Sequence, residues 1–333
     1  MGMKYFIHTY DSIITLENIL SAWQEFRRGK KQKKDVQEFE RNLMDNILLL
    51  YSDLKNKTYR HGNYHAFAIN DPKKRDIHKA TVRDRIVHHL LYNELCHYFN
   101  KRFIHDSYSC QIGKGTHKAL KRFTVFSRKV SKNYTKPCFV LKCDIRKFFA
   151  NIDHDILKQI LDKYITDKNV IKLLSNIIDS FQTIGNRGKG LPLGNLTSQL
   201  LVNIYMHEFD YFVKHNLKQK QYIRYADDFV FFDHHKQNFE KLIPILENFL
   251  LQKLQLEIHP QKLFITSIYS GIDFLGWIFF PHHTILRTVT KRRMFKKLQN
   301  NNFDEKSLQS YLGLLSHGNT WKLQQVLKNK QSI

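Results

Sequence analysis

The chain has 333 residues, 42% of them hydrophobic, enough to bury one extended catalytic unit or two ordinary cores. Its 54 Lys and Arg residues against 30 Asp and Glu give a formal net charge of +24, which favours a polyanionic partner such as nucleic acid. No run approaches the roughly 18 apolar residues that cross a bilayer, and no basic amphipathic helix lies beside a lipid anchor, so we expect no membrane partner.

The N-terminal segment and the cysteines predict the compartment. Residues 1–20 lack the charged region, continuous apolar core and small-residue cleavage site of a signal peptide. The four cysteines show no C-x-x-C spacing and predict reduced, mostly buried thiols, not a disulfide framework or a zinc site. They are Cys96, Cys110, Cys138 and Cys143. We therefore expect a cytoplasmic protein.

The first third of the chain predicts helices around a short strand-like segment. Residues 35–54 carry apolar side chains three to four positions apart and predict one amphipathic helix. The cation run at 27–34 before it fits a solvated loop and a phosphate contact equally well. Strand-like residues then flank a turn at Asp71-Pro72. A further helix follows, with a capping box that begins at Thr81.

The rest of the chain predicts a mixed core and a helical tail. Residues 137–149 form a nearly continuous apolar run that predicts a strand buried on both faces and ending in one carboxylate, Asp144. Segment 183–212 predicts a glycine-rich loop leading into a helix, and 221–233 predicts a hairpin. An amphipathic helix, strand-like segments and a basic helical tail follow. The expected fold class is α/β, with strands and helices in an α+β arrangement.

Asp227 and Asp228 stand side by side between aromatic and aliphatic residues. Adjacent carboxylates repel in a medium of low dielectric constant, so the pair needs a compensating charge. Magnesium ions prefer such hard oxygen ligands, and two metal ions stabilise both oxygens of an in-line phosphoryl transfer. Asp144 is the candidate third ligand, and it lies so far from Asp227 in the chain that only tertiary pairing brings them together. An ordinary hairpin turn, which Asp also favours, is the alternative.

Several motifs resemble those of the reverse transcriptases, in the order in which that family has them. The stretch "YADD", Tyr225 to Asp228, resembles the Y-x-D-D metal-binding turn, and 143–157 resembles the first metal motif. Residues 191–210 resemble the loop and helix beneath the template and incoming nucleotide. Other segments resemble the fingers blocks of bacterial group II intron-like enzymes and the late palm, primer-grip and thumb blocks: 75–89, 103–120, 259–266, 271–279 and 307–323.

The resemblance implies a right-hand polymerase with fingers, a palm made of an antiparallel sheet plus helices, and a short helical thumb. It also implies an RNA-directed DNA polymerase, a nucleotidyltransferase that adds dNTPs to the 3′ end of a DNA or RNA primer on an RNA template. The expected parts are an N-terminal helical extension at 1–60, fingers at 61–143 with 170–195 as a fingers/palm insertion, a palm at 144–280 and a thumb at 281–333.

The resemblance also assigns catalytic roles. Asp144, Asp227 and Asp228 are expected to hold two Mg²⁺ ions, with the carbonyl of Ile145 completing one coordination shell. Lys262 is expected to protonate the departing pyrophosphate.

Further residues are expected around the incoming nucleotide. Phe149 occupies the place of the steric gate that excludes a ribose 2′-OH, with plain core packing as the alternative. Arg75 and Lys79 are candidates to clamp the triphosphate, or they belong to a solvated basic face. Gly194 is expected to let the backbone approach the nucleotide, and Gln199 to stand near the template–nucleotide pair.

Two departures from the group II intron enzymes point to a subgroup. Those enzymes usually carry Q-G and S-P where this chain has Leu193-Gly194 and Ser198-Gln199. With "GKGTH" at 113–117, this pattern most resembles the enzymes of diversity-generating retroelements. Expected partners are a structured noncoding RNA, and a small accessory protein or a second reverse transcriptase.

Other functions remain open at this point. One is an anti-phage defence enzyme that makes cDNA from its own noncoding RNA or without a nucleic-acid template. Another is a non-catalytic, maturase-like RNA-binding protein, and a third is an RNA-dependent RNA polymerase.

Overall fold

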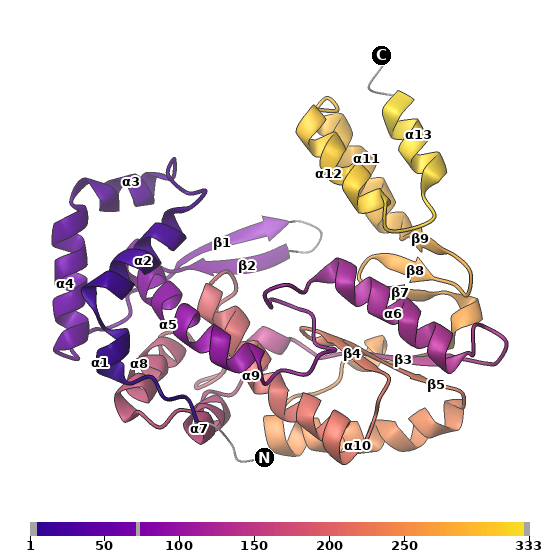
Figure 1. Cartoon of the computed structure of the whole chain (residues 1–333), viewed down its shortest axis with the longest axis horizontal. Coiled ribbons are helices and arrows are strands. Elements are labelled where there is room, and N and C mark those ends of the chain that lie inside the picture. Colours follow the sequence, from indigo (N-terminus) through magenta and orange to yellow (C-terminus); the bar gives the residue numbers. More distant parts are fainter. Residues whose placement is uncertain (1–4, 71–73, 330–333) are drawn as a thin grey trace. The chain divides into compact units, whose positions relative to one another are not determined.

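The computed structural model describes residues 5–70 and 74–329 (Figure 1). The turn expected at Asp71-Pro72 lies outside the described residues. The chain forms two compact units, each built from separated segments. The first unit contains the residues up to His105 together with Ile145–Leu217 and Glu247–Glu257, and the second contains Asp106–Asp144, Lys218–Leu246 and the residues from Ile258 onward.

The first unit is mainly helical. Strands β1 (His65–Asn70) and β2 (Lys74–Lys79) form an antiparallel hairpin in it. The centre is α5, which packs against α2 and α9. The α-helices of this unit are α1 (Tyr10–Ile13), α2 (Leu16–Arg27), α3 (Lys34–Arg41), α4 (Leu43–Lys55), α5 (Val82–Asn100), α7 (His154–Tyr164), α8 (Lys168–Asp179) and α9 (Leu196–Tyr211). Two short helices complete it, the 3₁₀-helix η1 (Phe148–Asn151) and the π-helix η2 (Phe212–Asn216).

Local signals explain where several of these helices begin and end. One of the two hydrogen bonds of the capping box predicted at Thr81 is confirmed, because the Thr81 side-chain oxygen accepts the backbone N–H of Asp84. The single helix predicted over 35–54 is wrong. Asn42 leaves the helical conformation (φ −118°, ψ 46°) and separates α3 from α4. The side-chain amide of Asn46 donates to the Phe39 carbonyl at 2.9 Å, which satisfies a backbone acceptor at the break.

The second unit is built on a four-stranded antiparallel sheet with the order β4-β5-β3-β6. Helix α6 (Thr116–Val130) packs against β4 and β5, with the Phe123 ring edge-on to that of Phe232 at 4.8 Å. The strands are β3 (Phe139–Asp144), β4 (Tyr222–Tyr225), β5 (Asp228–Asp233) and β6 (Phe264–Ser267). The predicted apolar strand and the predicted hairpin are therefore both confirmed.

Other elements of the second unit follow these strands along the chain. Helix α10 (Lys236–Leu254) begins in this unit, and the 3₁₀-helices η3 (Pro260–Lys262) and η4 (Ile268–Ser270) flank β6. A three-stranded antiparallel sheet comes next, made of β7 (Ile272–Phe274), β8 (Trp277–Phe279) and β9 (Thr284–Leu286).

The basic tail is helical, as predicted. Helices α11 (Thr288–Asn300), α12 (Glu305–Leu315) and α13 (Trp321–Asn329) lie side by side (Figure 1). Leu308 and Leu315, seven positions apart on α12, are fully buried. Gly318 sits directly over the Trp277 ring, and a Cβ there would come within 2.2 Å of it, so only glycine fits this close approach.

Two expectations on composition can be compared with the fold. Among the described helices, none combines the length and the apolar content needed to span a bilayer. All four cysteines are free thiols. Cys96, Cys138 and Cys143 are buried as expected, whereas Cys110 is exposed.

Candidate active site

Strand register brings Asp144 and Asp228 together. In the antiparallel pair of β3 and β5, Asp144 is the direct partner of Asp228, and Tyr225 of β4 pairs with Asp228 from the other side. Direct partners in such a ladder have Cα atoms about 4.5–5.5 Å apart. A slip of one residue would turn one of the two carboxylates to the opposite face of the sheet. The pairing expected of these distant acids is therefore present.

The turn that carries Asp227 is a two-residue loop between β4 and β5. Ala226 has a left-handed conformation (φ 56°), which a tight hairpin requires at its first loop position. The guanidinium of Arg224, whose side chain is fully buried, donates to the Ala226 carbonyl at 3.1 Å. Arg224 thus supports a conformation that alanine disfavours. Its position immediately before "YADD" was the only signal of this role in the sequence.

Two lysines neutralise the carboxylates. The ammonium of Lys142 lies 3.5 Å from Oδ2 of Asp228 and donates to the Asp273 carbonyl at 2.7 Å. The ammonium of Lys262 donates to Oδ1 of Asp144 at 2.6 Å. Sequence reasoning found Lys262 but missed Lys142, although its place two residues before Asp144 on one strand puts both side chains on the same face.

Asp228 is electrostatically strained despite these lysines. Burial is the main cause that raises its pKa from 3.8 to about 7, the charges of Asp144 and Asp227 raise it further, and Lys142 opposes them. Its second oxygen, Oδ1, is buried and has no hydrogen-bond partner among the described residues. A proton or a cation at that oxygen would relieve the strain.

These residues fit a divalent metal. The donor set consists of carboxylate oxygens, the ligands that Mg²⁺ prefers, and one of them is buried without a partner in the described part of the chain. Within the described part of the chain, no three Asp, Glu, His or Cys side chains already converge as a finished metal site. The ammonium groups of Lys142 and Lys262 instead stand beside Asp228 and Asp144. Metal binding therefore requires these side chains to rearrange.

Phe149 and Ile145 belong to the first unit. Ile145 is buried, and Phe149 is half-buried in η1 with its carbonyl accepting from the N–H of Leu191 at 2.8 Å. The neighbouring Phe148 is the one that is buried, and the two rings meet edge-on at 5.6 Å. Core packing thus falls mainly to Phe148, and the gate role of Phe149 stays a prediction.

Gly194 lies against the β1–β2 hairpin of the first unit. It has φ +104°, and a Cβ there would come within 2.7 Å of Ile77 on β2. The neighbouring Leu193 carbonyl accepts from the N–H of His78 at 3.0 Å. Strand β2 thus makes a close approach at this glycine, and the expected approach to the nucleotide stays a prediction. Gln199 is exposed on α9.

The two candidate triphosphate ligands differ in their surroundings. Arg75 is exposed on β2. Lys79 forms an ion pair with Asp35 at 2.7 Å, and Arg85 contacts the same carboxylate. A role in binding triphosphate requires Lys79 to leave that pair. The structure therefore gathers Asp144, Asp228, Asp227 and Lys262 in the second unit, while the candidate nucleotide-binding residues lie in the first.

Comparison with known proteins identifies the family of the chain. The family model described as "Reverse transcriptase (RNA-dependent DNA polymerase)" matches residues 69–279, well over half of the chain. The chain belongs to the reverse transcriptase family. Its resemblance to the group II intron-like enzymes of this family is confirmed by relatives encoded in introns.

Two relatives and one solved structure show the extent of the likeness. An uncharacterized 91 kDa protein in the cob intron of Schizosaccharomyces pombe is 29% identical over 151 residues, 44% of this chain and 18% of that protein. The group II intron-encoded protein LtrA of Lactococcus lactis subsp. cremoris is 22% identical over 275 residues, 62% of this chain and 45% of that protein. The chain thus spans less than half the length of both relatives.

The solved structure is telomerase from Candida albicans with a TWJ fragment of telomeric RNA. It matches with a TM-score of 0.53 and 12% identity, over 79% of this chain and 55% of that one. This likeness confirms the predicted fold class, the α/β right-hand polymerase fold.

Proposed function

We propose that the chain is an RNA-directed DNA polymerase that extends a primer with dNTPs by two-metal phosphoryl transfer. The observation that carries the proposal is the register pair of Asp144 and Asp228, with Asp227 next to it and one carboxylate oxygen that no described residue partners. These three acids, with the Ile145 carbonyl, are the residues that would hold two Mg²⁺ ions. Bound metal ions would activate the primer 3′-oxygen and neutralise charge on the departing pyrophosphate.

The chain's own groups act around that centre. The ammonium nitrogen of Lys262 lies 2.6 Å from Oδ1 of Asp144, and this group is the proposed proton donor to the leaving pyrophosphate. Phe149 excludes the ribose 2′-OH of rNTPs. Arg75 and Lys79 bind the triphosphate, the backbone at Gly194 passes close to the nucleotide, and Gln199 lies near the template–nucleotide pair.

The proposal also covers the division of the chain into polymerase subdomains, the genetic system it serves and its partners. Residues 1–60 form the N-terminal extension, 61–143 the fingers, 144–280 the palm and 281–333 the thumb. A role in a diversity-generating retroelement, with a structured noncoding RNA and an accessory protein as partners, is supported by the "GKGTH" stretch and the Gly194-to-Gln199 pattern. LtrA is named as the product of a group II intron, which supports an RNA partner. The buried free thiols support a cytoplasmic location.

Primer extension on an RNA template tests this function. The variant Asp227→Ala/Asp228→Ala should lose extension to the detection limit while it binds the primer–template as the wild type does. Asp45→Ala, which removes an exposed acid on α4, is the matched control and should extend normally. Normal extension by the double variant would refute the assignment. Extension with rNTPs alone would identify an RNA polymerase, and synthesis without any template would favour the defence enzyme.

A further inference from the structure

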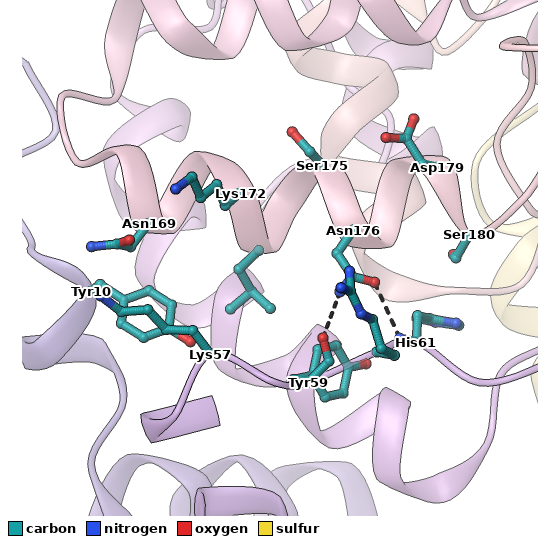
Figure 2. A pocket seen from close by; sticks show the side chains of 12 residues that line it. Tyr10, Lys57, Tyr59, His61, Asn169, Lys172, Ser175, Asn176, Asp179 and Ser180 are labelled. Carbon is teal, nitrogen blue, oxygen red and sulfur yellow. Dashed lines mark hydrogen bonds between the residues drawn. The ribbon is translucent and has the colours of Figure 1, made fainter. Parts of the chain in front are cut away.

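A pocket of about 630 Å³ lies in the first unit, apart from the site residues named above (Figure 2). One wall is the segment from Lys57 to His61 that follows α4. The other wall is one face of α8, where Asn169, Lys172 and Asn176 recur at helical spacing. The pocket is therefore a groove between a loop and a helix whose side chains are mostly polar.

Three cations line this pocket. The side chains of Lys57, Arg60 and Lys172 are exposed, and none of them forms an ion pair with a described residue. Lys57 has a left-handed backbone (φ 60°) at the end of α4, and its ammonium lies 5.9 Å from the ring of Tyr10. Three unpaired cations around one concavity produce a positive potential that favours an anionic ligand.

The acidic residues nearby are already engaged. Asp167 caps α8 and accepts the N–H of Tyr10 at 2.7 Å. Asp179 contacts the ammonium of Lys158 at 2.6 Å and lies 3.3 Å from the His154 ring. Asp179, which also lines the pocket, is therefore paired with Lys158, whereas the charge of Asp167 acts on Lys57, so the lining keeps an excess of positive charge.

The loop that carries Arg60 is fixed before any ligand binds. The side chain of Asn176 donates to the Tyr59 carbonyl at 2.7 Å and accepts the N–H of His61 at 3.2 Å, as the dashed lines in Figure 2 show. Asp84, which is fully buried, accepts the Tyr59 hydroxyl at 2.7 Å and the N–H of Gly62 at 3.2 Å. A fixed loop lowers the conformational entropy lost on binding.

The lining also indicates which part of a ligand is recognised. Tyr10 and Tyr59 are only 4% and 3% exposed, so neither offers an open ring on which a base can stack. Recognition by charge without stacking is the pattern of phosphate contacts. We propose that this pocket binds the phosphate backbone of an RNA segment. This inference rests on the proposed function in one respect, namely that the anionic ligand is RNA.

A charge-removal variant tests the proposal. Lys57→Gln/Arg60→Gln/Lys172→Gln is compared with Lys236→Gln/Lys241→Gln/Lys253→Gln, which removes three exposed cations of α10. Binding of a labelled oligouridylate is measured by fluorescence anisotropy, without dNTPs, from 50 to 200 mM KCl. Each single-strand phosphate contact contributes about 0.7 to the slope of log K against log salt. The pocket variant should therefore lose about 2 from that slope, and the control less than about 0.7.

Several outcomes would overturn the proposal. One is a pocket variant with the wild-type slope, and another is an equal loss in the control variant. ATP that displaces the oligouridylate from the wild type but not from the pocket variant would assign the pocket to a free nucleotide. Ser175→Glu adds a negative charge to the same wall and should weaken binding at least threefold if the triple variant does not fold. Failure of primer extension would leave these binding results intact.

Discussion

Replacing Asp228 by Asn tests the charge balance at the start of β5. Burial, with the charges of Asp144 and Asp227, raises the pKa of Asp228 from 3.8 to about 7 in the folded chain, against the opposing Lys142. An acid whose pKa is raised by folding makes the folded state lose stability as the pH rises, here between about 4 and 7. At about 1.4 kcal/mol per pKa unit, the loss reaches about 4 kcal/mol above pH 7. Because 20% of the side chain is exposed, solvent screening makes this an upper bound.

The assay is urea unfolding of both proteins in EDTA at two pH values. Asn carries no charge, so Asp228→Asn should gain more stability relative to the wild type at pH 8 than at pH 5. Linkage gives about 2–3 kcal/mol for the difference between these two gains. That difference cancels every pH-independent effect of the substitution, and the attraction of Lys142 for the ionised carboxylate is already contained in the pKa of Asp228. Equal gains at both pH values would refute a strained, buried carboxylate. Added Mg²⁺ should reduce the variant's advantage at pH 8, because it binds the wild-type acids more tightly.

Three more substitutions test single side chains around the site. Phe149→Ala should increase the use of rNTPs relative to dNTPs at least tenfold in single-nucleotide extension, and unchanged selectivity would assign the ring to packing. Arg224→Met leaves the Ala226 carbonyl without its donor, so the free energy of unfolding should fall by about 1–3 kcal/mol. The change in kcat should be larger than the change in KM. A fully active variant would contradict the role given to the turn. Lys262→Ala should slow extension by about 10²-fold or more and flatten the alkaline limb of the pH–rate profile, whereas an unaltered profile would exclude proton donation.

Where a signal is local, the sequence predicted the structure correctly. The apolar run before Asp144 and the aromatic residues on both sides of Asp227 and Asp228 predicted a strand and a hairpin, and both formed. The cap at Thr81 formed too, because its hydrogen bond spans only three residues. The helix over 35–54 failed because apolar spacing does not register one polar residue, Asn42, that leaves the helix.

Where a residue's partner lies far along the chain, the prediction was incomplete. Lys79 was expected at a triphosphate, but its ion pair with Asp35 depends on where α3 packs. The space beside Gly194 is filled by Ile77 of a hairpin more than a hundred positions earlier. Lys142 was not recognised, because its spacing from Asp144 indicates a shared face of the strand but not that its ammonium reaches Asp228 on β5.

The amino-acid sequence by itself determined which acids are present, which of them end a strand or occupy a turn, and that the chain has a large excess of positive charge. Only the tertiary structure decided that Asp144 stands opposite Asp228, that a buried Arg224 supports the turn, and that two lysines form ion pairs with these carboxylates. The reason is that strand register and ion pairing between distant segments depend on how the whole sheet packs, and no short stretch of residues contains that information.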